Sequence, residues 1–162
     1  MYYFLFSVNI KSNRGYKMRN KKDAFVIMSV FSHRKSKADN LENHKKTLAH
    51  LKAFGLKHKV VEGVYRGEAE LSIMIPVINE VFDLSTVEQL AHIYDQESIL
   101  FVDEDRNAEL RFMVKAFDEN LKELKPEKLG KFVATTKGIA EQCNGYTKDG
   151  NDYYICDHRH LN

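Results

Sequence analysis

The sequence is poor in cysteine and has no long apolar segment. Its 162 residues include two cysteines, Cys143 and Cys156, and neither belongs to a CxxC pair. A disulfide framework in a chain of this kind would need more cysteines, so we expect a reducing, cytoplasmic compartment. No apolar run approaches the roughly 20 residues that cross a bilayer. We therefore expect no association with a membrane.

A strong charge of one sign is also missing. The chain has 25 basic and 23 acidic residues, which leaves a formal net charge of +2. The basic excess lies mostly in residues 11–22 and not along a candidate binding face. A nucleic-acid surface usually carries a concentrated basic patch. We therefore expect no nucleic acid as a partner.

Several common catalytic and ligand-binding motifs are absent. The sequence contains no GxGxxG or GxxxxGK[ST] loop for phosphate groups and no GxSxG nucleophile elbow. Cys156, His158 and His160 lie close together near the C-terminus, but their spacing matches no standard zinc pattern. We expect no metal site.

The composition fits one folded domain. Hydrophobic residues make up 43% of the chain and aromatic residues 11%, which is enough to form a core. A chain of this length usually forms one domain. We place a single domain at residues 21–157, after a leader at residues 1–20 and before a tail at residues 158–162.

The leader does not resemble a secretory signal. Its apolar residues come first and its basic residues follow, which is the reverse of the order in a signal peptide. Arg14 and Gly15 stand just before Met18, as in a ribosome-binding site translated by mistake. We interpret residues 1–20 as disordered or mis-annotated, with Met18 as the true start. The alternative is a genuine N-terminal strand or arm.

Alternating and helical patterns predict an α+β fold. Gly55 favours the end of the first helix, and Ser85 with Glu88 resembles a capping box at the start of the second. The patterns predict strands at residues 24–31, 57–65, 70–75, 99–102 and 108–114, helices at 39–54 and from 85 onward, and C-terminal strands at 132–136 and 152–156. The order β-α-β-β-α-β predicts a ferredoxin-like antiparallel sheet with two helices on one face.

The hairpin from Gly63 to Ser72 is the main candidate site. Along a strand, side chains two residues apart share a face, so Glu68, Glu70 and Ser72 should point the same way. Two carboxylates and a hydroxyl on one face, near Tyr65, suit a cationic ligand. The alternative is an ordinary charged sheet edge in contact with solvent.

Four segments resemble the phage enzymes that degrade S-adenosylmethionine, known as SAM lyases and formerly as SAM hydrolases. The likeness is collinear across most of residues 24–157. It rests on Ser29-Val30-Phe31 after an apolar strand, Asn40-x-x-x-His44 followed by Leu51-Lys52-Ala53, Gly63-Val64-Tyr65-Arg66 followed by Glu-x-Ser, and the closing segments Leu129-Gly130-Lys131-Phe132 and Gly145-Tyr146-Thr147-x-Asp149-Gly150.

This resemblance implies roles for individual residues. Glu70 or Glu68 would hold the substrate ammonium, and Tyr65 would lie near the sulfonium. Glu70 is preferred because Glu70-x-Ser72 keeps the spacing of the family, although the connection after Tyr65 is shorter here. The remaining residues that would contact substrate are Ser29, Phe31 and Ser32 on the adenosine side, together with Arg66 and Ser72. No cofactor is implied.

The resemblance also implies a reaction and an assembly. The substrate's own carboxylate would attack its γ-carbon and release homoserine lactone and 5′-methylthioadenosine. A homotrimer like that of PII proteins, with sites between subunits, is expected by analogy. The setting would be the cytoplasm of a phage host, where destroying S-adenosylmethionine opposes restriction. The alternatives are hydrolysis to homoserine, a PII-like module that binds an adenine nucleotide or S-adenosylmethionine without turnover, and a phage protein that acts by protein contact.

Overall fold

The computed structural model describes residues 23–65, 68–113 and 125–160. Within these residues, β-strands dominate and the helices are few. The elements are β1 (Phe25–Ser29), α1 (Lys37–Ala53), β2 (Lys59–Tyr65), β3 (Glu68–Pro76), α2 (Glu80–Ile93), β4 (Ser98–Val102), β5 (Asn107–Phe112), β6 (Glu127–Thr135), α3 (Lys137–Ala140), β7 (Gly145–Asp149), β8 (Asp152–Asp157) and a 3-10 turn, η1 (His158–His160).

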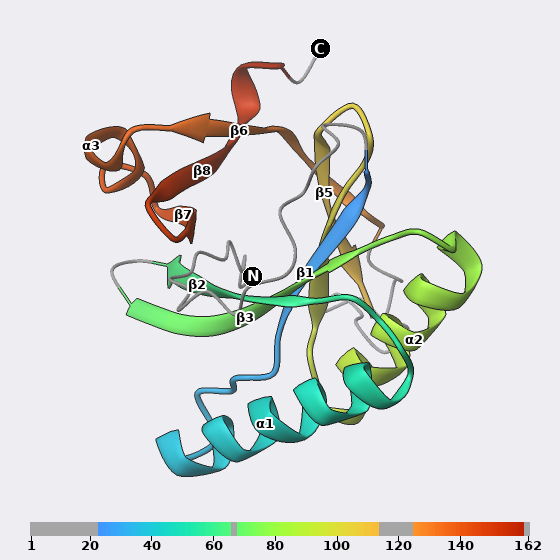
Figure 1. Ribbon diagram of the computed structural model, residues 1–162. Helices are drawn as coiled ribbons and strands as arrows, with labels where there is room; N and C mark the ends of the chain where they lie inside the picture. Colours follow the sequence, from blue (N-terminus) through green and yellow to red (C-terminus); the bar gives the residue numbers. More distant parts are fainter. Residues whose placement is uncertain (1–22, 66–67, 114–124, 161–162) are drawn as a thin grey trace.

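The described strands form a closed barrel. Their order around the wall is β1-β3-β2-β7-β8-β6-β5-β4, and β4 returns to β1. Neighbouring strands run antiparallel throughout. Figure 1 shows α1 and α2 together on one side of this wall, whereas β6, β7 and β8 lie away from them.

The ferredoxin-like prediction is therefore wrong. The elements β1, α1, β2, β3, α2 and β4 do follow one another in the expected order. A ferredoxin-like sheet would be open beyond β2 and β4, however, and here both strands have a further partner. Residues Glu62–Tyr65 of β2 pair with β7, and β4 pairs with β5. The C-terminal strands are thus half of the wall and not additions to an open sheet.

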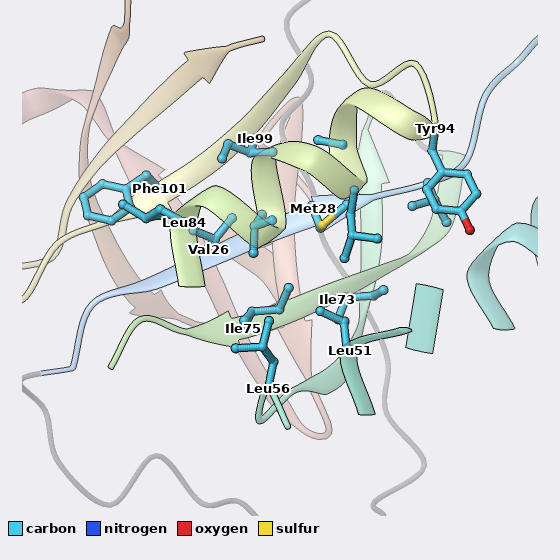
Figure 2. Packing of buried hydrophobic residues seen from close by; sticks show 14 of the residues in the cluster. Val26, Met28, Leu51, Leu56, Ile73, Ile75, Leu84, Tyr94, Ile99 and Phe101 are labelled. Carbon is cyan, nitrogen blue, oxygen red and sulfur yellow. The ribbon is translucent and has the colours of Figure 1, made fainter. Parts of the chain in front are cut away.

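Strand alternation produces two cores, one on each face of the wall. In β1, Val26 and Met28 pack outward in a cluster with residues of α1 and α2. Phe25 and Ile27 belong to a second cluster with residues of β2 to β6, which fills the inside of the barrel. Figure 2 shows the outer cluster, in which Leu51 of α1 and Leu84 of α2 reach the outer face of β1 and β3.

The start of α2 differs from the prediction. The helix begins at Glu80, and the side chain of Asn79 accepts a hydrogen bond from the Phe82 N–H at 3.2 Å. Asp83 reinforces this end because its carboxylate accepts from two N–H groups of the preceding turn. The predicted cap, Ser85, lies inside the helix. Both Asn79 and Ser85 are suitable caps by residue type, and the earlier one is used because Leu84 is buried against the sheet.

Gly130 makes the contact between β6 and β8 possible. Its φ of +87° lies in the left-handed region, which other residues rarely adopt. A Cβ atom at this position would overlap the carbonyl group of Asp157, coming within 2.7 Å of its carbon. The pairing of β6 with β5 also shifts register here, between Ala108 and Glu109. The backbone of β6 can therefore approach β8 closely only with glycine at this point.

Candidate active site

The inner face of β3 carries the predicted site. Glu70 and Ser72 lie on the same side of this strand as Met74, which belongs to the inner core. Ser29 of β1 is the cross-strand partner of Ser72. Gly63 of β2 lies opposite Glu70 and contributes no side chain. The fold therefore brings Glu70, Ser72 and Ser29 together on the inner face of the wall, beside a position without a side chain.

Glu70 has an environment unlike that of its neighbour Glu68. The pKa of Glu70 is raised to about 7, mainly by burial; a hydrogen bond with Ser29 acts against this rise and the nearby charge of Glu68 adds to it. Glu68, at the start of β3, is exposed. A carboxyl group whose pKa lies near neutrality in a partly buried position is typical of functional sites. The structure thus supports Glu70 over Glu68.

Ser29 links Glu70 to the segment that follows β1. Its hydroxyl lies 3.2 Å from the carbonyl oxygen of Leu71, to which it donates, and accepts from the Phe31 N–H at 3.0 Å. The carboxyl group of Glu70 is a second acceptor for the same hydroxyl proton, and this interaction lowers the pKa of Glu70. One serine therefore connects the acidic residue of β3 with the β1–α1 loop.

Ser72 is fully buried, and its hydroxyl has no hydrogen-bond partner among the residues that the structure describes. A buried hydroxyl without a partner costs free energy, so such groups are rare in folded proteins. Its position next to Ser29 and two residues from Glu70 places an unused donor and acceptor beside the candidate site.

The β1–α1 loop presents Phe31 and Ser32 beside these residues. Phe31 is partly buried, and its ring meets that of His44 edge to face, with centroids 6.1 Å apart. Ser32 is also partly buried, and its hydroxyl accepts from the Arg34 N–H at 3.2 Å. Both predicted adenosine-side residues are thus close in sequence and space to Ser29, which the structure joins to Glu70.

Two predicted site residues, Tyr65 and Arg66, stand at the end of β2 and directly after it in the sequence. The backbone of Tyr65, at the end of β2, pairs with Glu68 and Gly145. The side chain of Tyr65 and the whole of Arg66 lie outside the described residues, as does the whole of the predicted leader. Their proposed contacts with substrate stay predictions.

Sequence reasoning did not assign a role to Asn40 or Gln96. Asn40 of α1 binds the backbone of Ser32, and Gln96, between α2 and β4, binds the carbonyl oxygen of Phe31. The helical spacing from Asn40 to His44 and Leu51 was a usable signal, because it places a polar residue on the buried face of α1. Gln96 had no comparable signal, since its contact spans 65 residues.

The described residues hold no group of three or more histidine, cysteine, aspartate or glutamate side chains arranged for a metal ion. Cys156 lies partly buried in contact with the inner core, and burial raises its pKa to about 12. The thiol is therefore protonated at neutral pH and is a poor nucleophile.

Comparison with known proteins supplies the family. The model of the S-Adenosylmethionine lyase family matches residues 26–157. The chain belongs to the S-adenosylmethionine lyase family. The match runs from β1 to the end of β8 and includes Ser29, the β1–α1 loop and Glu70. No curated protein shows a significant match to the chain.

Membership of the S-adenosylmethionine lyase family confirms the predicted substrate and enzyme class. The protein is an enzyme that degrades S-adenosylmethionine, and the alternative of a PII-like module without turnover is set aside. In the part of the chain that the structure describes, no helix is long and apolar enough to span a membrane.

Proposed function

We propose that the protein converts S-adenosylmethionine into homoserine lactone and 5′-methylthioadenosine. An oxygen of the substrate carboxylate forms a bond to the γ-carbon while the bond from that carbon to sulfur breaks. The bonding electron pair goes to sulfur, so the sulfonium leaves as a neutral thioether and no proton moves. The protein's main contribution is then to bring carboxylate and γ-carbon together, an effect that reaches about 7–11 kcal/mol in well-oriented reactions.

Glu70 is proposed to hold the substrate ammonium. The observation that carries this role is its partly buried position, in hydrogen-bond contact with Ser29 and opposite Gly63. An ionised carboxylate here lacks full hydration and gains most from a cationic partner. Pairing with the ammonium also leaves the substrate carboxylate free to attack.

The adenosine half would lie against the β1–α1 loop. Phe31 offers an aromatic ring for the adenine, and Ser29 and Ser32 offer polar groups next to it. Tyr65 would lie near the sulfonium, where an aromatic face favours a cation. Ser72 and Arg66 complete the proposed substrate contacts, and the unpartnered hydroxyl of Ser72 supports its place among them.

Hydrolysis is the second candidate, and one observation favours it. A pKa of about 7 for Glu70 also suits a general base acting on water. Reaction in ¹⁸O-labelled water separates the two mechanisms by mass spectrometry of the first product. We expect unlabelled homoserine lactone together with 5′-methylthioadenosine. Label inside unopened lactone, or homoserine as the first product, would exclude the proposed path.

The activity should depend on the ionisation of Glu70. The ionised form binds the ammonium, so kcat/KM should rise with pH through about 7. Because the Ser29 hydrogen bond lowers the pKa of Glu70, Ser29→Ala should move this rise to higher pH. Ser85→Ala, at an exposed position of α2, is the matched control and should leave the profile unchanged. A profile that stays in place in Ser29→Ala would contradict this role of Glu70.

The homotrimer and the setting stay predictions. Among the strands that the structure describes, no edge is free for assembly by sheet extension, the PII-like mode, because they form a closed barrel. A trimer with sites between subunits would therefore need contacts other than extension of this sheet. The expected cytoplasmic location rests on the scarcity of cysteine, and phage origin and a role against restriction rest on the family resemblance.

A further inference from the structure

Side chains bind much of the backbone of the β1–α1 loop around Phe31 and Ser32. The N–H of Phe31 is bound by Ser29 at 3.0 Å, and its carbonyl oxygen by Gln96 at 3.3 Å. The N–H and carbonyl groups of Ser32 are both bound by Asn40, and the carbonyl also accepts from the Lys35 N–H at 3.0 Å. The loop conformation is therefore set by side chains from β1, α1 and the turn after α2, together with one backbone turn from Ser32 to Lys35, and not by pairing with another strand.

Asn40 makes the most specific of these contacts. Its amide oxygen accepts from the Ser32 N–H at 2.9 Å, and its amide nitrogen donates to the Ser32 carbonyl at 3.0 Å. The side chain thus binds one residue at both ends, as a neighbouring strand would. The amide is buried, so an unpaired group would carry a desolvation cost.

The buried face of α1 is unusual in its polarity. Its buried residues are Asn40, His44, Thr47 and Leu51, so three of the four are polar. A helix that only covered a sheet would place apolar residues there, because burial of polar groups costs stability. The ring of His44 meets the ring of Phe31 edge to face. The polar residues nearest the start of α1 therefore face the loop that lies beside the candidate site.

The loop is connected to Glu70 by a continuous set of contacts. Asn40 binds Ser32, the adjacent Phe31 binds Ser29, and Ser29 contacts Glu70. A shift of the loop at Ser32 would move the ring of Phe31. It would also disturb the hydrogen bond from the Phe31 N–H to the Ser29 hydroxyl. The positions of the adenosine-side residues and of Glu70 are thus linked through residues 29–32.

We propose that Asn40, assisted by Gln96, is a positioning residue for the adenosine half of the substrate. This inference rests on the proposed function of the loop. Asn40 does not touch the substrate. It holds Phe31 and Ser32 in the conformation that receives adenosine, and so reduces the ordering that binding would otherwise require.

The test uses 5′-methylthioadenosine, which lacks the amino-acid half of the substrate. In Asn40→Asp an oxygen replaces the amide nitrogen and opposes the Ser32 carbonyl. We expect the affinity for 5′-methylthioadenosine, measured by calorimetry on the full chain, to fall about 10-fold or more. KM for S-adenosylmethionine should rise similarly, with a smaller change in kcat. Glu70→Gln should bind 5′-methylthioadenosine like the wild type, because it acts on the other half.

Thr47→Val is the matched control for the buried face of α1. The Thr47 hydroxyl donates within the helix, to the Asn43 carbonyl at 2.9 Å, so this variant should keep the affinity while changing the thermal midpoint. Equal losses of affinity in Thr47→Val and Asn40→Asp would show a merely structural role and overturn the inference.

Gln96→Ala provides a second variant if Asn40→Asp does not fold, and it should weaken 5′-methylthioadenosine binding in the same way. Wild-type affinity in either loop variant would reject the positioning role. An active wild type with that result rejects this inference alone, whereas a wild type that forms no 5′-methylthioadenosine from S-adenosylmethionine rejects the proposed function.

Discussion

Glu70→Gln should reduce kcat/KM for S-adenosylmethionine about 30-fold to several-thousand-fold. Glutamine keeps the size of the side chain but removes the charge that would pair with the substrate ammonium. Loss of one partner of a close charge pair typically costs about 2–5 kcal/mol, which converts to this range at about 1.4 kcal/mol per factor of ten. Steady-state assays of 5′-methylthioadenosine formation near pH 8, where Glu70 is ionised in the wild type, measure the effect.

The same substitution should make the protein more stable at that pH. The folded-state pKa of Glu70 is raised to about 7 from 4.5, so the folded protein favours the protonated form. Stability from this group is complete below pH 4.5 and is lost as the pH rises through about 7. Glu70→Gln removes this loss, and its free energy of unfolding at pH 8 should exceed that of the wild type by about 1–3 kcal/mol. Reduced activity together with increased stability would separate a lost charge from misfolding.

Glu68→Gln resolves the choice between the two acidic residues. Glu68 is exposed, and ion pairs in solvent contribute about 0–1 kcal/mol. We expect less than about a five-fold loss of kcat/KM from this variant. A loss as large as that of Glu70→Gln, or larger, would transfer the ammonium-binding role to Glu68.

Gly130→Ala should destabilise the fold by about 3 kcal/mol or more. The substitution combines a left-handed φ of +87° with overlap between the new Cβ and the Asp157 backbone. A non-glycine residue in that region costs about 1–2 kcal/mol, and a clash with backbone adds to it because neither strand can move without breaking barrel pairs. Urea unfolding of the full chain measures the change.

Two other glycines serve as controls that separate the cost of the left-handed φ from the cost of the clash with Asp157. Gly150 also has a positive φ, +63°, but nothing lies within 4 Å of a Cβ built there, so Gly150→Ala should lose only about 1–2 kcal/mol. Gly138 in α3 has equally open surroundings, and Gly138→Ala should change stability by less than about 1 kcal/mol. Equal losses for Gly130→Ala and Gly150→Ala would show that contact with β8 does not limit this position.

Much of the local structure could be predicted from the sequence, and the predictions that failed have local causes. The alternation in residues 57–65 and 70–75 indicated β2 and β3 because strands place every second side chain on the same face. The predicted start of α2 was wrong because Asn79 and Ser85 are both suitable N-cap residues. β7 was not predicted as a strand, since its five residues, Gly145–Asp149, contain polar and small residues and end in a turn.

The candidate site, like the fold, could be predicted only in part. The period of two along a strand places Glu68, Glu70 and Ser72 on one face, and family likeness pointed to this segment. The period cannot tell which of these side chains is buried, because depth depends on the strands that cover the site. Asn40 and Gln96 were not assigned roles, since their partners in the β1–α1 loop are set by the packing of α1 and α2.

By itself, the sequence determined the family, the substrate, the order of elements from β1 to β4, and the hairpin that bears Glu70. These features depend on local patterns and collinear motifs. Only the tertiary structure decided that the sheet closes and that Glu70, rather than Glu68, is partly buried beside Ser29. Closure depends on the pairing of β2 with β7, whose partners Gly63 and Thr147 are far apart in the chain. The free energy of such contacts is realised only when the whole barrel is formed, so no local pattern can reveal it.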